Sequence, residues 1–509
     1  MRAIRRGMKT NNKAEFGDFQ TPARLARKVC ELLSTWEAQP KTLVEPTCGR
    51  GNFLFAALDR FPSIIRAFGL DISPDYTRFV NAELEKRPDG NKVEIIEGDF
   101  FRTDWLTVLR DLPEPVVVVG NPPWVTSARL SVLGSSNAPV KSNFQKHSGL
   151  DAMTGKSNFD ISEWMLIRIL RWLDGRDAVM GMLCKTTVAR KLLSYGWKNN
   201  INLSNSAIYQ VDAPSFFDAS VDACLLVCGF SKGARSQTCR VYNNLGGDVL
   251  LGTISSRNGE MIASLELYER WKHLVGDAKR WRSGIKHDCS KVMEFVREGN
   301  KYRNGFGELV ELDDEYMYPM LKSSEVADNS NNEPKRWMLV PQRSVRDDTS
   351  VIKNIAPKTW NYLLRHAEFL DKRKSSIYKK RPRFSVFGVG DYSFSLWKVV
   401  ISGFYKKLSF KVIGNIAGKP VVLDDTCNFI PCESREEAEH LSSLLNSNIA
   451  KEFFEAFIFW DAKRPITVEI LRRLDLSALE QEVNKGAHTE GQNEHSQTIA
   501  PRLPFVSIE

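Results

Sequence analysis

The sequence lacks an apolar run long enough to cross a bilayer, which takes about 20 consecutive apolar residues, so we expect no membrane partner. It also lacks the ligand spacing of a zinc site, because none of its nine cysteines stands with histidines in a zinc-finger arrangement. We therefore expect no structural metal. Scattered cysteines of this kind fit reduced thiols in a cytoplasmic protein.

Neither sign of charge dominates, since 71 Lys and Arg residues stand against 62 Asp and Glu residues, for a net charge of +9. This excess is mild for 509 residues and is by itself weak evidence for a polyanionic partner. The sequence shows no internal repeat and no convincing nuclease motif. Its 42% hydrophobic and 26% charged residues are typical of a globular protein, and its length favours two or three domains.

Short apolar runs alternate with helical patterns in the first half, which predicts a doubly wound α/β domain with a largely parallel sheet. We expect strands at residues 42–45, 65–70, 93–96, 116–119, 178–184 and 223–230, and helices at 52–61 and 164–173. The regular alternation ends near residue 235. We therefore expect a first domain at 1–235, a mixed α+β domain at 236–483, and an unstructured polar tail at 484–509.

Three acidic residues mark the ends of the first three expected strands. Glu45, Asp71 and Asp99 each end a strand or follow it within three residues. A turn containing Gly49 and Gly51 follows the first strand, but it lacks the third glycine of a dinucleotide fingerprint, which argues against NAD. A glycine pair in a turn is more often structural than functional. The three acidic strand ends together favour a nucleoside-binding site.

In a nucleoside-binding site, three side chains would each contact a different part of the ligand. Asp71 is placed to accept hydrogen bonds from both ribose hydroxyls, and Asp99 to accept one from an adenine amino group. Phe100 offers an aromatic face for the adenine ring. The alternative is structural, with Asp99 as a capping residue beside core phenylalanines, and the sequence leaves it open.

The segment 116–124, Val-Val-Val-Val-Gly-Asn-Pro-Pro-Trp, identifies the chemistry. Pro122 and Pro123 fix the backbone and remove two amide donors, so that the nearby carbonyls are presented as rigid acceptors. Asn121 adds a neutral side-chain acceptor, and Trp124 adds a flat surface for stacking. Two acceptors and an aromatic ring suit a planar base that carries an amino group.

Such a base needs this arrangement because the lone pair of an aromatic amine is delocalised into the ring. Acceptors for both N–H groups favour the pyramidal nitrogen of the transition state over the planar ground state. The proton leaves after a methyl group arrives, so no strong base is required. The segment therefore predicts methylation of an exocyclic amine, the alternative being an ordinary loop.

These motifs, in this order, resemble the amino-methyltransferases of the gamma order, typified by the Taq adenine methyltransferase of restriction–modification systems. The resemblance implies a Rossmann-like class I methyltransferase domain, S-adenosyl-L-methionine as cofactor, and methylation of adenine N6 in double-stranded DNA after base flipping. It also implies a second, target-recognition domain at 236–483. A cognate restriction endonuclease or a defence-system subunit is a candidate partner.

The resemblance carries site residues with it. In the family a leading element closes over the methionine part of the cofactor, and residues 16–22 look like that element. The implied cofactor-binding residues are Phe19, Gln20, Thr21, Glu45, Thr47, Gly49, Gly51, Asp71, Ile72, Asp99, Phe100 and Asn121. The implied catalytic residues are Asn121, Pro122, Pro123, Trp124 and Phe216.

The match to the family varies along the chain. Residues 214–223 resemble the place where the family sets a second aromatic against the flipped base, which Phe216 fits best, with Phe217 as the alternative. Trp124 is a departure, since the Taq-type enzyme has tyrosine there, although other adenine enzymes have tryptophan. The segments 156–160, 444–447 and 460–475 also look familiar.

The second half mixes basic and aromatic residues, as a surface that faces a DNA groove does. The candidate DNA-binding residues are Arg282, Lys286, Lys379, Lys380, Arg381 and Arg383. A second mixed group contains Trp397, Lys398, Phe404, Tyr405, Lys406, Lys407 and Lys411. The run His287-Asp288-Cys289 is not expected to be catalytic, because adjacent residues do not converge as a triad does.

Three other activities share the Asn-Pro-Pro-aromatic pattern: methylation of cytosine N4, of adenine in RNA, and of glutamine in proteins. The size of the second half argues against most RNA and glutamine enzymes, and asparagine at position 121 favours adenine over cytosine. A non-catalytic DNA-binding subunit is the alternative from another class. The intact Gly51, Asp71 and Asn121 argue against it.

Overall fold

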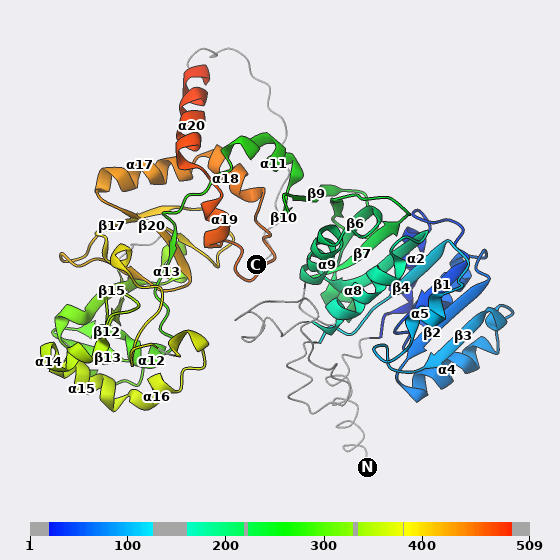
Figure 1. The fold of residues 1–509 in the computed structure, drawn as a ribbon, viewed down its shortest axis with the longest axis horizontal. Helices are drawn as coiled ribbons and strands as arrows, with labels where there is room; N and C mark the ends of the chain where they lie inside the picture. The colour runs from blue at the N-terminus through cyan, green and yellow to red at the C-terminus, as the bar shows by residue number, and fades with distance from the viewer. Residues whose placement is uncertain (1–19, 126–159, 218–221, 329–333, 380, 491–509) are drawn as a thin grey trace. The chain divides into compact units, whose positions relative to one another are not determined.

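The computed structural model describes residues 20–125, 160–217, 222–328, 334–379 and 381–490. The chain forms two compact units, Met1–Glu266 and Leu267–Glu509 (Figure 1). No helix in the described ranges is long and apolar enough to cross a membrane.

One mixed sheet forms the centre of the first unit. Its strands are β1 (Thr42–Glu45), β2 (Arg66–Asp71), β3 (Val93–Glu97), β4 (Val116–Gly120), β5 (Ala178–Lys185), β6 (Leu203–Val211), β7 (Ala223–Phe230), β8 (Thr238–Tyr242), β9 (Leu250–Arg257) and β10 (Glu260–Ile262). They lie in the order β10-β9-β8-β6-β7-β5-β4-β1-β2-β3. Strands β1 to β5 run parallel, and β7 runs antiparallel between β5 and β6. The strand order reverses between β1 and β4, which is where sheets of this kind bind ligands, at the carboxyl ends of the strands.

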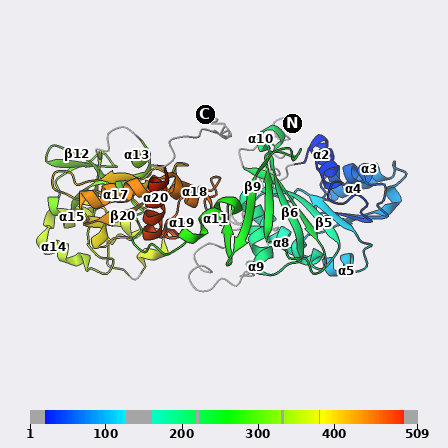
Figure 2. The same ribbon diagram turned by 90° about the horizontal axis from the view of Figure 1, so that it is seen from above.

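Helices cover both faces of this sheet (Figure 2). One face carries α2 (Ala23–Leu33), α3 (Asn52–Arg60) and α4 (Pro74–Leu84), and the other carries α5 (Trp105–Leu109), α8 (Ile161–Leu173) and α9 (Thr186–Lys198). Val117 and Val119 of β4 are buried in the same core as Leu33 of α2, as strand alternation requires. A Cβ atom on Gly181 of β5 would lie 2.6 Å from a methyl group of Leu33, so glycine permits the close approach of α2.

The predicted doubly wound α/β domain is confirmed, and several strands match closely. The strands expected at 42–45 and 223–230 coincide with β1 and β7. The sequence does not predict β6, because Ser204, Asn205 and Gln210 interrupt its apolar pattern. This strand is nevertheless held on both sides, antiparallel to β7 and parallel to β8.

The first unit also continues beyond residue 235, where we expected it to close. Strand β8 pairs with β6, and β9 and β10 then extend the sheet as antiparallel strands. Cys239, Ile254 and Ile262 of these three strands are buried. The extension therefore belongs to the sheet of the first unit, and this compact unit ends at Glu266.

The second unit contains two sheets, which agrees with the mixed α+β organisation expected for it. The six-stranded sheet has the order β14 (Leu309–Val310), β13 (Lys301–Asn304), β12 (Glu294–Glu298), β16 (Arg336–Leu339), β15 (Met317–Leu321) and β19 (Val422–Leu423). The four-stranded sheet has the order β11 (Arg282–Ser283), β20 (Cys427–Cys432), β17 (Trp397–Ser402) and β18 (Lys411–Ile413).

Helices lie before, between and after the strands of these sheets in the sequence. They are α11 (Leu265–Trp271), α12 (Ser290–Met293), α13 (Ser323–Ala327), α14 (Ile352–Ile355), α15 (Pro357–Arg365), α16 (Ala367–Asp371), α17 (Arg435–Leu445), α18 (Asn448–Glu455), α19 (Val468–Arg472) and α20 (Leu476–Glu490). Phe295, Met338 and Tyr362 lie at the core of the six-stranded sheet. Helix α20 reaches into the stretch 484–509 that we expected to be unstructured, and residues 491–509 lie outside the described residues.

Candidate active site

The carboxyl ends of β1, β2 and β4 bring the predicted site residues to one edge of the sheet. Glu45 is the last residue of β1, Asp71 is the last residue of β2, and Asn121 directly follows β4. These strands are adjacent in the sheet, in the order β4-β1-β2. Residues that are far apart in the sequence therefore share one site.

The glycine turn after β1 is built around the carboxylate of Asp71. The amide of Gly49 donates a hydrogen bond of 2.8 Å to Asp71 Oδ2, and the amide of Ser73 donates one of 2.9 Å to Oδ1. Gly49 and Gly51 have φ angles of +50° and +73°, a backbone region that favours glycine. A Cβ atom on Gly49 would lie 2.8 Å from the side-chain amide of Gln20, which would then have to shift.

Glu45 supports the glycine turn by holding the start of the helix that follows it, α3. Its Oε2 accepts a hydrogen bond of 2.8 Å from the amide of Leu54, in the first turn of α3. The side chain is buried, and this burial raises the pKa of the Glu45 carboxyl well above its usual value, a shift that the Leu54 hydrogen bond reduces and Asp71 increases. Glu45 therefore fixes the start of α3 against β1.

The leading element is tied to both motifs through Thr21. The backbone carbonyl of Thr21 accepts a hydrogen bond of 2.8 Å from Asn52 Nδ2, and its hydroxyl accepts one of 3.2 Å from Asn121 Nδ2. Gln20 Oε1 accepts a further bond of 3.0 Å from the amide of Arg50. These contacts place residues 20 and 21 beside the glycine turn and the Asn-Pro-Pro-Trp block. Phe19 lies outside the described residues.

The residues at this edge fit S-adenosyl-L-methionine. Two buried polar atoms, Thr47 Oγ1 and Trp124 Nε1, have no hydrogen-bond partner among the described residues, and such atoms are normally satisfied. They follow β1 and β4, on the two sides of the point where the strand order reverses. The carboxylate of Asp71 is a ready acceptor for ribose hydroxyls, and the side chain of Ile72, 45% exposed, offers an apolar surface to a ring. A polar ligand with an adenosine part would complete this site.

Asp99 and Phe100 are placed differently from the other predicted residues. Asp99 Oδ1 accepts a hydrogen bond of 2.8 Å from the amide of Phe101, which is a turn-capping contact. The ring of Phe100 is buried between Trp105 and Trp172, at centroid distances of 5.4 Å and 5.2 Å. This packing favours the structural alternative for Phe100 that the sequence left open.

The Asn-Pro-Pro-Trp block is packed against a second aromatic residue. Trp124 is buried and meets Phe217 edge to face, with ring centroids 5.3 Å apart. Phe217 belongs to the short helix α10 (Ala213–Phe217) and is buried, whereas Phe216 is only half-buried. Phe217 is thus the packing partner of Trp124, and Phe216 keeps more of its ring accessible.

One basic residue near this block was not predicted. Lys185, at the end of β5, pairs with Asp160 Oδ2 at 2.7 Å and lies 3.4 Å from the carbonyl oxygen of Trp124. Asp160 in turn caps α8, accepting a bond of 3.1 Å from the amide of Ser162. The available signal was a polar residue at the end of a fifth apolar strand, the same signal that identified Asp71.

The candidate DNA-binding residues of the second unit fall into two groups. Arg282 and Arg383 have intramolecular partners: Arg282 lies over the ring of Tyr392 at 5.2 Å, and Arg383 pairs with Asp371 at 2.7 Å. Lys379 and Arg381 are exposed. No ion pair joins either of them to another described residue, and Lys380 lies outside the described residues.

Lys286 and the segment that follows Arg373 are held together. The hydroxyl of Tyr378 donates a bond of 3.2 Å to the carbonyl of Lys286, and Arg373 donates bonds of 3.1 Å and 2.8 Å to the carbonyls of His287 and Ser385. The sequence had indicated Lys286 and the 379–383 segment separately. The structure brings them together.

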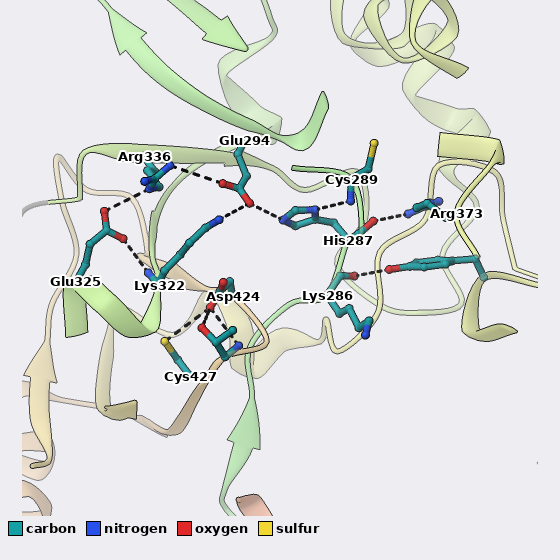
Figure 3. A network of polar contacts seen from close by, with 12 residues as sticks. Lys286, His287, Cys289, Glu294, Lys322, Glu325, Arg336, Arg373, Asp424 and Cys427 are labelled. Carbon is teal, nitrogen blue, oxygen red and sulfur yellow. Dashed lines mark hydrogen bonds and ion pairs between the residues drawn. The ribbon is translucent and has the colours of Figure 1, made fainter. Parts of the chain in front are cut away.

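The His287-Asp288-Cys289 run takes part in a structural network (Figure 3). His287 Nδ1 accepts a bond of 3.1 Å from the amide of Cys289, and Nε2 faces Glu294 Oε1 at 3.2 Å. Glu294 also pairs with Lys322 at 2.6 Å. Both imidazole nitrogens are therefore engaged, and no group of three or more His, Cys, Asp or Glu residues suited to a metal occurs in the described ranges.

Comparison with known proteins agrees with this geometry. The model of the N-6 DNA Methylase family matches residues 6–242, a range that contains the glycine turn and the Asn-Pro-Pro-Trp block. The Type II methyltransferase M.NspV of Nostoc sp. (strain ATCC 29411 / PCC 7524) is 44% identical over 469 residues, which cover 92% of this chain and 97% of that protein.

A solved structure shares the fold across both units. The type IIL restriction-modification enzyme MmeI, in complex with DNA, aligns with a TM-score of 0.50 at 12% identity, over 93% of this chain and 68% of that chain. At this identity the likeness concerns the fold alone. The match to the family model and the 44% identity to M.NspV over most of both chains show that this protein belongs to the N-6 DNA methylase family of S-adenosylmethionine-dependent DNA methyltransferases.

Proposed function

We propose that this protein methylates the N6 amino group of adenine within a specific sequence of double-stranded DNA, as the modification enzyme of a type II restriction–modification system. The observation that carries the proposal is the position of Asn121-Pro-Pro-Trp124. The block follows β4, which lies next to β1 in the order β4-β1-β2, and its asparagine donates a hydrogen bond to Thr21. The name of the relative M.NspV supports the type II assignment.

The order of the motifs supports a gamma-class, Taq-type organisation. Residues 20 and 21 contact the glycine turn and Asn121 from the N-terminal side, and the second compact unit follows the catalytic sheet. We assign target recognition to this second unit. A cognate restriction endonuclease that recognises the same sequence is the partner system that this assignment implies.

The chain itself supplies binding, orientation and acceptors. S-adenosyl-L-methionine, when bound, supplies an electrophilic methyl group on a sulfonium. Asp71 receives the ribose hydroxyls while it holds the amides of Gly49 and Ser73, so the turn and the cofactor share one anchor. The side-chain carbonyl of Asn121 and the carbonyl at Pro122 accept hydrogen bonds from the adenine amine, which favours the pyramidal nitrogen of the transition state.

The target base reaches this edge only after it leaves the helix, at a cost of a few kcal/mol. Phe216 is the residue that we assign to the extruded base, because Phe217 is already packed against Trp124. We assign the phosphate contacts that offset this cost to Lys286, Lys379 and Arg381. Arg373 and Tyr378 hold the two segments that carry these residues together.

The decisive experiment is single-molecule sequencing of DNA from cells that lack other methyltransferases and express this protein. We expect N6-methyladenine at one recurring sequence with the wild type and none with Asn121→Ala. Calorimetry with S-adenosylhomocysteine supplies the control. Asn121→Ala should still bind the cofactor measurably, because Asp71 and the glycine turn are unchanged, and any loss of affinity should reflect the Asn121–Thr21 contact.

Each alternative gives a distinct outcome. Methylcytosine in a recurring context would replace adenine N6 by cytosine N4 as the target. Unmodified DNA together with tight cofactor binding would point to RNA or protein as the substrate. Unmodified DNA without any cofactor binding would point to a non-catalytic DNA-binding subunit.

A further inference from the structure

The loop between β17 and β18 presents two aromatic and two basic residues to solvent. Phe404, Tyr405, Lys406 and Lys407 are consecutive and all exposed, and they lie between buried residues at 403 and 408. Neighbouring exposed aromatic side chains often mark a surface that binds a partner. The part of the chain that the structure describes offers no ion-pair partner to either lysine.

The first end of this loop is fixed by close backbone packing. The amide of Gly403 donates a bond of 2.9 Å to the carbonyl of Thr426. A Cβ atom at position 403 would lie 2.8 Å from that carbonyl oxygen and 3.2 Å from the carbonyl oxygen of Ile466, so only glycine fits. The hydroxyl of Ser402 accepts bonds of 3.3 Å from the amides of Phe404 and Tyr405.

The second end is fixed by α17. Asn446 accepts a bond of 3.1 Å from the amide of Phe410 and donates one of 2.8 Å to its carbonyl, to which Ser442 also donates at 3.0 Å. Asn446 and Ile466 belong to the two C-terminal segments, 444–447 and 460–475, whose sequence resembles the family. Both segments thus serve to hold this loop.

The two aromatic rings of the loop differ in their surroundings. Arg464 lies over the ring of Phe404 at 4.9 Å and is itself anchored by a bond of 2.8 Å to the carbonyl of Asp425. The ring of Tyr405 is 46% exposed and has no such cover among the described residues. Tyr405 is therefore the free aromatic at the tip of a loop that is fixed at both ends.

We propose that Tyr405 stacks on a DNA base that is uncovered when the target duplex is opened, while Lys406 and Lys407 contact backbone phosphates. This inference rests on the proposed function, because it needs a duplex that is opened. Removing one base from the stack uncovers the faces of its neighbours, and an aromatic side chain that covers such a face recovers part of the lost stacking. The two lysines beside the ring carry positive charge, which is complementary to the negative phosphates on either side of an opened step.

The test uses full-length protein and a duplex that carries the sequence found to be methylated. Tyr405→Ala should weaken duplex binding about 5- to 150-fold, the factor that corresponds to losing roughly 1–3 kcal/mol of stacking on one base. Tyr405→Phe keeps the ring and should bind like the wild type. On a duplex whose target adenine is mismatched, and hence cheaper to open, both proteins should bind more tightly and the Tyr405→Ala defect should persist, because the mismatch lowers the opening cost equally for both.

The lysines give a separate readout. The double variant Lys406→Ala/Lys407→Ala should reduce the slope of log affinity against log salt by about 2, whereas Tyr405→Ala should leave the slope unchanged. A Tyr405→Phe defect as large as that of Tyr405→Ala would overturn the stacking role, because the phenylalanine ring can still stack on a base. Wild-type affinity of Tyr405→Ala for the paired duplex would overturn the loop's contact with DNA and leave it as a surface for another protein. Absence of methylation by the wild type would instead overturn the proposed function.

Discussion

At the scale of single residues, Asp71 has two tasks, which makes it the sharpest test of the cofactor site. Its carboxylate holds the Gly49 and Ser73 amides and is assigned to the ribose hydroxyls. Asp71→Ala should weaken cofactor binding about 10- to 150-fold, as expected for lost hydrogen bonds to a charged group of roughly 1.5–3 kcal/mol. Calorimetry with S-adenosylhomocysteine measures this. Asp75→Ala is the matched control, since that exposed carboxylate pairs only with Arg78 at 2.6 Å, and a similar loss in both variants would contradict the assignment.

Glu45 makes the stability of the ligand-free protein depend on pH. In the unfolded chain its carboxyl ionises near the usual pKa of 4.5, and burial raises this pKa in the folded protein. The folded state therefore binds the proton more tightly, so the stabilising contribution is complete below about pH 4.5 and is lost as the pH rises through the folded pKa.

Glu45→Gln removes that titration while keeping an acceptor for the Leu54 amide. We expect its melting temperature to fall less steeply than that of the wild type between about pH 5 and about pH 8. Thermal unfolding followed by circular dichroism at a series of pH values checks this. Parallel curves for the two proteins would show that Glu45 is not the titrating group.

Sequence reasoning identified the residues of the site that stand in short linear motifs. Asp71 and Asn121 were found because each ends or follows an apolar strand, and parallel strand ends meet at one edge. The bond between Asn121 and Thr21 joins residues 100 positions apart, and no local pattern predicts it. Phe100 illustrates the opposite case, because its burial depends on Trp172, which belongs to a distant helix.

At the scale of elements, the sequence predicts uniformly apolar central strands best. Strands β1 and β4 are buried along their whole length, so their composition alone reveals them. Strand β6 has exposed polar residues and depends on pairing with β7 and β8 for its conformation. The short strands of the second unit, several of only two or three residues, carry too little pattern to be predicted.

The link from β5 to α8 positions the backbone that follows Pro122 and Pro123. Lys185 reaches the carbonyl of Trp124 and pairs with buried Asp160, which caps α8. Lys185→Met should therefore lower kcat about tenfold, through misplacement of the acceptors, with little change in the KM for the cofactor.

A matched control lies on the neighbouring helix. Lys191 pairs with the buried carboxylate of Glu163 at 2.7 Å, the same distance as in the Lys185–Asp160 pair, but Lys191 makes no contact with the Asn-Pro-Pro-Trp block. Lys191→Met should thus lose comparable thermal stability while retaining kcat. If both variants lost kcat in proportion to stability, the effect of Lys185 would be one of folding only.

At the scale of the whole molecule, the extent of the large sheet decides where the first compact unit ends. Strands β8 to β10 follow the expected boundary at residue 235, yet they continue the sheet and bury Cys239, Ile254 and Ile262. The described residues to which we assign cofactor binding all lie between residues 20 and 121. We therefore assign cofactor binding to the first unit, whereas the proposed DNA contacts of Lys286 and Tyr405 belong to the second.

This division predicts how two fragments behave. Residues 1–266 should bind S-adenosylhomocysteine within about threefold of the full chain, because the sheet is complete, but should not methylate DNA. Residues 1–235 should unfold at least about 5 °C lower, since removal of β8 leaves the edge of β6 unpaired and uncovers buried side chains. Calorimetry and thermal unfolding of both fragments measure the difference. Equal stability of the two would mean that β8 to β10 only connect the units, and methylation by residues 1–266 would remove the second unit from target recognition.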